Sequence, residues 1–74
     1  MAKYIIYLAG FEYLDRVVRA VESVGGRVVK IGKFSPYIVV EMPERAMAMV
    51  SGVEGVAGIM PAPEFRTHQV EIPF

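Results

Sequence analysis

The sequence predicts a small α+β domain of the ferredoxin-like kind, with a four-stranded antiparallel sheet, two helices on one face and a C-terminal tail. Two segments carry apolar residues at helical spacing, and four others have the composition of strands. These elements follow one another as βαββαβ. With right-handed strand-helix-strand crossovers, this order places both helices on the same face of the sheet. We therefore divide the chain into a domain, residues 1–63, and an extended tail, residues 64–74.

The first half of the domain begins with a strand and continues with an amphipathic helix. Residues Lys3–Ala9 are rich in Tyr, Ile and Leu, as is typical of a strand. A helix is expected from Phe11 to Val24. Gly25 and Gly26 end it, because a helix C-terminus commonly needs a left-handed residue. The apolar face of this helix consists of Leu14, Val17, Val18, Val21 and Val24.

The second half contains the remaining three strands and a second helix. Strands are expected at Arg27–Phe34 and Tyr37–Met42, joined by a turn at Ser35-Pro36. Pro43 suits the first turn of a helix, because the missing N–H is not needed there. The last strand spans Val56–Met60 and is stopped by prolines. The buried stripe of the second helix consists of Ala46, Met47 and Val50.

Alternation along the strands separates a core face from an outer face. The side chains expected to face the helices are Ile6, Leu8, Val29, Ile31, Ile38, Val40, Val56 and Ile59. This assignment leaves Tyr7, Lys30, Tyr37 and Val39 on the outer face. Aromatic and aliphatic side chains on an open sheet suit a flat protein partner. An ordinary half-solvated sheet is the alternative.

The composition argues against several classes of function. There is no Cys and only one His, so we expect no disulfide, no metal site and no cofactor. The acids stand singly, and no nucleophile has a plausible general base near it in the sequence, so no catalytic residue is assigned and an enzyme is not expected. Eight basic and eight acidic residues without a cluster disfavour nucleic acid as a partner. No apolar run approaches the roughly 18 residues that span a membrane.

The N-terminal residues do not resemble a secretory signal. We therefore expect a cytoplasmic protein as the sequence is written, and an extracellular one if it is part of a secreted precursor. The chain has no Asn and one Gln, a composition that fits a thermophile.

The chain resembles the propeptide-like inhibitor domains of subtilisin-type proteases from Lys3 to about Pro63. The run Val21–Val29, with its double glycine, is similar to the end of the first helix and the following strand in that family. The run Pro43–Val50, followed by Gly55-Val56 and Ile59, resembles the second helix and the last strand. The resemblance implies an inhibitor, an intramolecular chaperone, or both, for a subtilisin-like serine protease.

The same resemblance implies which residues bind the protease. The open sheet face would pack on the protease through Tyr7, Tyr37 and Val39. The tail would lie in the substrate cleft, with the terminal Phe74 suited to an apolar specificity pocket. The tail residues assigned to protease binding are Glu64, Val70, Ile72, Pro73 and Phe74.

Two features depart from the family pattern. Propeptides carry acids in the last strand, where Met60 and Ala62 stand here, with Glu64 the nearest acid. The tail is also longer, and Pro63 and Pro73 interrupt strand pairing. The alternative function is a small regulatory module that pairs its open sheet in a homo-oligomer and is able to bind a small ligand. A third possibility, RNA binding through sheet aromatics, is disfavoured by the charge.

Overall fold

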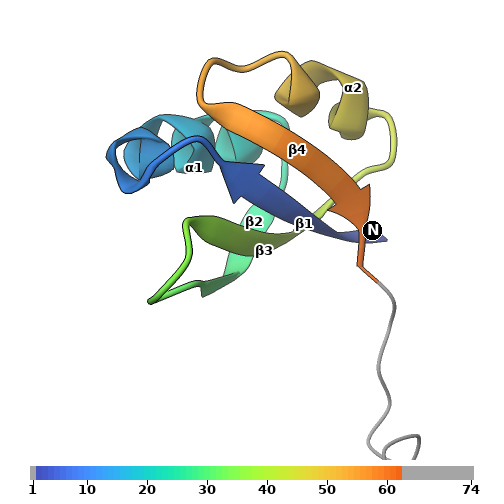
Figure 1. The fold of residues 1–74 in the computed structure, drawn as a ribbon. Helices are drawn as coiled ribbons and strands as arrows, with labels where there is room; N and C mark the ends of the chain where they lie inside the picture. The colour runs from blue at the N-terminus through green and yellow to red at the C-terminus, as the bar shows by residue number, and fades with distance from the viewer. Residues whose placement is uncertain (1, 63–74) are drawn as a thin grey trace, which may run out of the picture.

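The computed structural model of the chain describes residues 2–62 and contains one four-stranded antiparallel sheet. The strand order is β2-β3-β1-β4, so β1 and β3 are central and β2 and β4 lie at the edges. This order confirms the predicted ferredoxin-like topology (Figure 1). The strands are β1 (Ala2–Leu8), β2 (Arg27–Ile31), β3 (Tyr37–Met42) and β4 (Val56–Pro61).

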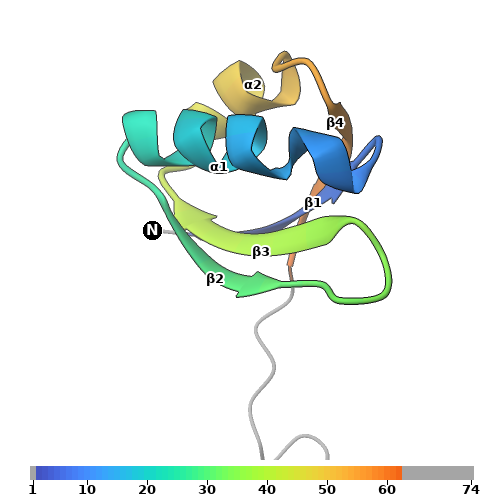
Figure 2. The same cartoon turned by 90° about the vertical axis from the view of Figure 1, so that its left-hand side faces the viewer.

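The helices form a single layer over one face of the sheet (Figures 1 and 2). A 3-10 turn at Phe11–Tyr13 leads into α1 (Leu14–Ser23), and α2 spans Ala46–Ser51. Gly25 follows α1 with a φ of 87°, which confirms the predicted left-handed end of this helix. The second helix begins later than expected. Pro43 lies in a turn before α2, closed by a hydrogen bond from the Ala46 N–H to the Pro43 carbonyl at 2.9 Å.

The core lies between the sheet and the helices. Four strand residues predicted for it are buried, and α1 adds Val17 and Val21, which have no exposed surface. Val56 and Ile59 are partly buried and pack against this core, as predicted. Tyr4 and Met42 are also buried, although the sequence analysis did not place them there. The buried core residues are Tyr4, Ile6, Leu8, Val17, Val21, Ile38, Val40, Met42, Ala46 and Val50.

The prediction that Val29 and Ile31 belong to the core is wrong. Val28 pairs with Val40, but the next pair joins Lys30 to Val39, so the register shifts at Val29. Such a bulge leaves an extra residue unpaired and breaks the alternation of faces. Val29 is therefore 48% exposed, and Val28 packs against the core instead. Ile31 pairs with buried Ile38, yet it lies near the end of an edge strand and is 46% exposed.

The helices in the described part of the chain are short. Within residues 2–62, none has the length and apolar character that crossing a membrane requires.

Candidate protein-binding face

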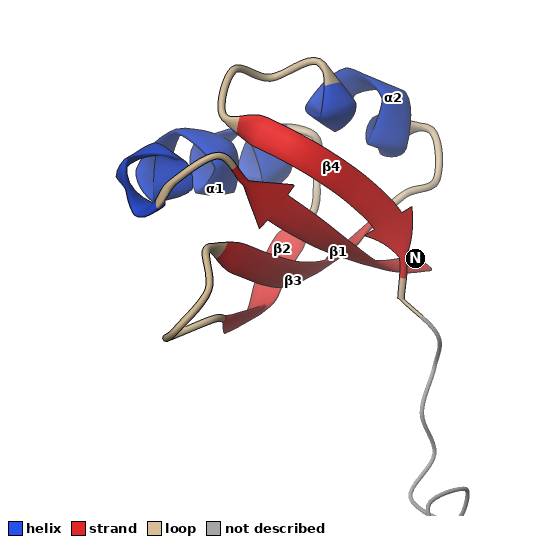
Figure 3. Cartoon of the chain, viewed as in Figure 1, coloured by secondary structure: helices blue, strands red, loops and turns tan. Residues whose placement is uncertain are grey.

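The sheet face opposite the helices carries no covering element in the described structure (Figure 3). We call it the open face. The pairing register brings its apolar side chains together: Tyr7 lies opposite Tyr37, and Ile5 lies between Val39 on β3 and Met60 on β4. Directly opposed residues on neighbouring strands are the pairs whose side chains contact one another in a sheet. The open face consists of Lys3, Ile5, Tyr7, Arg27, Lys30, Tyr37, Val39, Glu41, Gly58 and Met60.

A shallow hollow of about 410 Å³ occupies the part of the open face next to the β2–β3 loop. The four residues predicted for the outer face all line it, together with one further β1 residue and one loop residue. The lining residues are Ile5, Tyr7, Lys30, Ser35, Tyr37 and Val39. The structure therefore places Tyr7, Tyr37 and Val39 side by side, although their contact with a protease stays a prediction.

The ring of Tyr37 is positioned by Gly32, the first residue after β2. A side chain at position 32 would meet the Cδ2 of Tyr37 at 2.5 Å, so only glycine leaves room for the ring. The backbone fixes the same residues, since the Gly32 N–H donates to the Tyr37 carbonyl at 2.8 Å. The Tyr37 N–H in turn donates to the Ser35 carbonyl at 2.9 Å. These contacts hold one aromatic ring of the open face in place.

Large apolar side chains are exposed on and beside the open face. Tyr7 is 44% exposed, and its hydroxyl donates a weak hydrogen bond to the Sδ of Met60 at 3.9 Å. Phe34, in the β2–β3 loop, is 97% exposed. Contiguous exposed apolar surface on a small soluble domain usually marks an interaction site. The open face and this loop are therefore the candidate binding surface.

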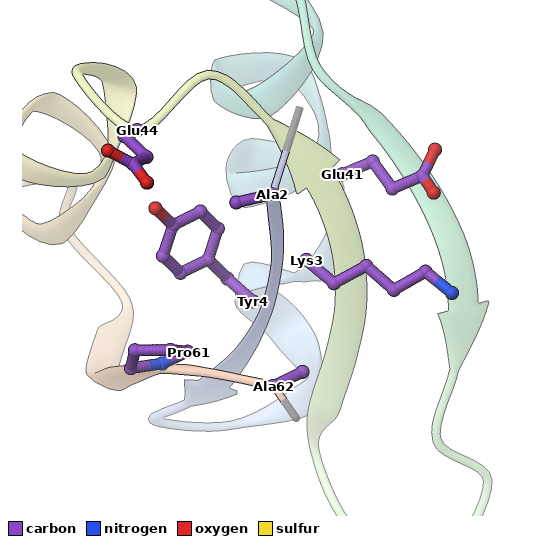
Figure 4. Close-up of a pocket in the computed structure, with 7 residues that line it drawn as sticks. All are labelled: Ala2, Lys3, Tyr4, Glu41, Glu44, Pro61 and Ala62. Carbon is purple, nitrogen blue, oxygen red and sulfur yellow. The ribbon is translucent and has the colours of Figure 1, made fainter. Parts of the chain in front are cut away.

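One ion pair lies on the open face. The guanidinium of Arg27 donates to the Oε1 of Glu41 from Nε at 2.8 Å and from Nη2 at 2.7 Å. The Glu41 side chain is partly covered, with 24% of its surface exposed. Figure 4 shows Lys3 and Glu41 pointing to the same side of the sheet. The lysines of the chain, Lys3, Lys30 and Lys33, are exposed.

A second hollow, of about 360 Å³, lies at the end of the sheet where β1 begins and β4 finishes (Figure 4). Its walls come from both faces: Tyr4 points its hydroxyl toward the carboxylate of Glu44 on the helical side, and Lys3 and Glu41 lie on the open side. The hollow lies beside Ala62, the last residue that the structure describes.

The predicted tail residues lie outside the described residues, and so does His68. These tail residues are Glu64, Val70, Ile72, Pro73 and Phe74. Within residues 2–62, the structure contains no group of three or more side chains that could together hold a metal ion. The candidate site inside the described residues is therefore the open face with the adjoining β2–β3 loop.

Comparison with known proteins adds no further identification. No protein-family model matches the sequence, and no curated protein gives a significant match. The likeness to the subtilisin propeptides accordingly rests on the sequence resemblance alone.

Proposed function

We propose that this protein binds a subtilisin-like serine protease through its open face and acts as its inhibitor, its folding chaperone, or both. The observation that carries the proposal is the apolar group of Ile5, Tyr7, Tyr37 and Val39 on an uncovered sheet face. Aromatic and aliphatic side chains of this kind form the buried centre of protein interfaces. The resemblance of the helix ends and of the last strand to the propeptide family supplies the identity of the partner.

The tail supports the inhibitory part of the proposal. The chain continues for twelve residues beyond Ala62, which lies next to the end of β4. Twelve extended residues span about 40 Å, enough to pass from the sheet to a neighbouring cleft. An extended segment that pairs with cleft strands is a common mode of peptide recognition. In our proposal, residues 64–74 occupy the substrate cleft while the open face binds the protease surface.

The first test is a titration of the protein against a subtilisin-like protease, followed by intact-mass analysis of the mixture. Stoichiometric inhibition, with the tail uncut or slowly cut, is the expected result. No inhibition, together with rapid digestion by several such proteases, would refute the proposal. A concentration-dependent dimer in sedimentation would then favour the sheet-pairing module instead.

A pair of matched variants tests the open face itself. Tyr7→Glu places a charge at the centre of the proposed interface and should weaken inhibition by about thirtyfold or more, as the loss of a central hot spot does. Met49→Glu makes the same kind of change at another exposed apolar residue, on α2, and should leave inhibition unchanged. Equal effects of the two variants would show that the open face is not the contact surface.

A truncation tests the tail. Deleting Gln69–Phe74 should abolish inhibition and leave the melting temperature unchanged, because the buried core described above lies within residues 4–50. Inhibition that survives this deletion would exclude the role in the cleft.

A further inference from the structure

The charged residues of the described domain separate by face, although the sequence distributes them evenly. The open face and the adjoining β2–β3 loop carry four cations and one carboxylate, a net charge of +3. The helical layer and its loops carry five carboxylates and three arginines, a net charge of −2. The first group is Lys3, Arg27, Lys30, Lys33 and Glu41, and the second is Glu12, Asp15, Arg16, Arg19, Glu22, Glu44, Arg45 and Glu54.

The positive charge of the open face surrounds an apolar centre. Lys30 lines the hollow that Ile5, Tyr37 and Val39 form, and Lys33 follows it in the loop that also exposes Phe34. The one carboxylate of this face, Glu41, is already paired with Arg27. When a partner covers the apolar centre, the edge of its contact surface therefore lies close to Lys30 and Lys33. No carboxylate of this face lies opposite these two lysines.

We propose that the partner of the open face presents an apolar patch bordered by carboxylates. The proposal rests on the proposed function, in which that partner is a protease, and specifies the charge of the protease surface. Opposite charges around an interface steer association and suppress wrong partners. The same complementarity disfavours a second copy of this chain, because two open faces would bring a charge of +3 against +3.

The centre of the face favours a protein over a nucleic acid. Tyr7, Tyr37 and Phe34 offer rings on which bases stack, but the middle of the face consists of Ile5, Val39 and Met60, which are aliphatic or thioether side chains and offer bases no aromatic surface. The Cδ2–Cε2 edge of the Tyr37 ring also lies close to Gly32. An apolar protein surface contacts the aliphatic and the aromatic side chains of this centre alike.

The first experiment measures inhibition of the subtilisin-like protease by charge variants at about 20 mM and about 0.5 M NaCl, concentrations that differ strongly in screening. The double variant Lys30→Glu/Lys33→Glu should raise the inhibition constant about tenfold at low salt, and the difference should shrink to about twofold at high salt. Arg19→Glu/Arg45→Glu makes the same change of charge on the helical layer and should stay within about twofold of the wild type. Glu41→Gln, which removes the one carboxylate of the open face and so raises its net charge, should tighten inhibition about twofold.

Several results would overturn the inference while leaving the inhibitor function intact. Inhibition that does not respond to Lys30→Glu/Lys33→Glu is one, and an equal loss in Arg19→Glu/Arg45→Glu is another. Tighter inhibition by Lys30→Glu/Lys33→Glu would show that the partner surface is basic.

A second experiment tests the inference without a protease. Two amphipathic helical peptides share the same Leu positions and differ only in carrying Glu or Lys beside them. In NMR titrations, the Glu peptide should shift the amide resonances of Ile5, Tyr7 and Val39, and the Lys peptide should not. Equal responses, no response to the Glu peptide, or preferential shifts with a single-stranded oligonucleotide would each refute the acidic protein partner. Binding of the Glu peptide without protease inhibition would refute only the proposed function.

Discussion

Replacing Gly32 by Ala should destabilise the domain and disturb its open face. The added Cβ would lie 2.5 Å from the Tyr37 Cδ2 and 2.6 Å from the Ser35 carbonyl oxygen. Carbon atoms pack best at about 3.5–4.0 Å, so the ring has to move by about 1 Å. The Ser35 oxygen has less freedom, because it accepts the hydrogen bond from the Tyr37 N–H. Overpacking of this kind costs about 1–3 kcal/mol.

Part of that cost is offset, because alanine restricts the unfolded chain and thereby stabilises by about 0.4–1 kcal/mol. The net loss of free energy of unfolding for Gly32→Ala is then about 0–2.6 kcal/mol, with a centre of about 1.3 kcal/mol, and this central value lowers the melting temperature of a domain of this size by roughly 5–10 °C. The loss of free energy of unfolding is measured by urea unfolding, monitored by far-UV circular dichroism and tyrosine fluorescence. Tyrosine is a usable probe because the chain has no Trp.

Gly58→Ala is the matched control for this prediction. Position 58 lies on β4 opposite Tyr7, has no positive φ, and has no atom within 4 Å of an added Cβ. The substitution should therefore leave the free energy of unfolding unchanged or raise it by up to about 1 kcal/mol. If Gly32→Ala is as stable as Gly58→Ala, the packing of Tyr37 on Gly32 does not determine the shape of this loop.

Three further predictions concern the core, an ion pair and the β2–β3 loop. Val21→Asp buries an unpaired charge and should unfold the domain, whereas Val18→Asp, at a partly buried site, should cost less; thermal melts by circular dichroism distinguish the two. Glu54→Gln should change the free energy of unfolding by less than about 0.5 kcal/mol, because its 2.6 Å contact with Arg16 joins side chains that are 70% and 57% exposed. A larger loss in urea unfolding would give this pair a structural role. Phe34→Ser should leave the melting temperature unchanged, since the ring is almost fully exposed, and should weaken protease inhibition; an unchanged inhibition constant would place the loop outside the interface.

The order of the elements could be predicted because each signal is local. The first helix is indicated by the spacing of Val17 and Val21 and by the glycines after α1, signals that involve only neighbouring residues. The right-handed crossover rule then determines the order of the strands in the sheet. The outer-face positions Tyr7, Tyr37 and Val39 also followed from strand alternation, because β1 and β3 pair without a register shift along their length.

The errors have a common cause in long-range geometry. Alternation placed Val29 in the core, but the bulge in β2 depends on its pairing with β3 and leaves no local signal in the sequence. The burial of Tyr4 depends on β4 and on the loop before α2 lying over the end of the sheet, which the sequence order alone does not reveal (Figure 4). The separation of charge by face was missed for the same reason, since a count along the chain does not distinguish the two layers.

The bulge at Val29 also affects how the domain avoids aggregation. A flat edge strand offers unpaired N–H and C=O groups to a neighbouring molecule, and this chain, with 54% hydrophobic residues, is exposed to that risk. The register shift in β2 twists this edge, and the exposed Lys30 beside it adds a charge that an incoming strand would have to desolvate. At the other edge, β4 ends in Pro61, which has no N–H to offer. Both features make the edges less suitable for the addition of a further strand, which lowers the risk that accompanies an uncovered apolar face.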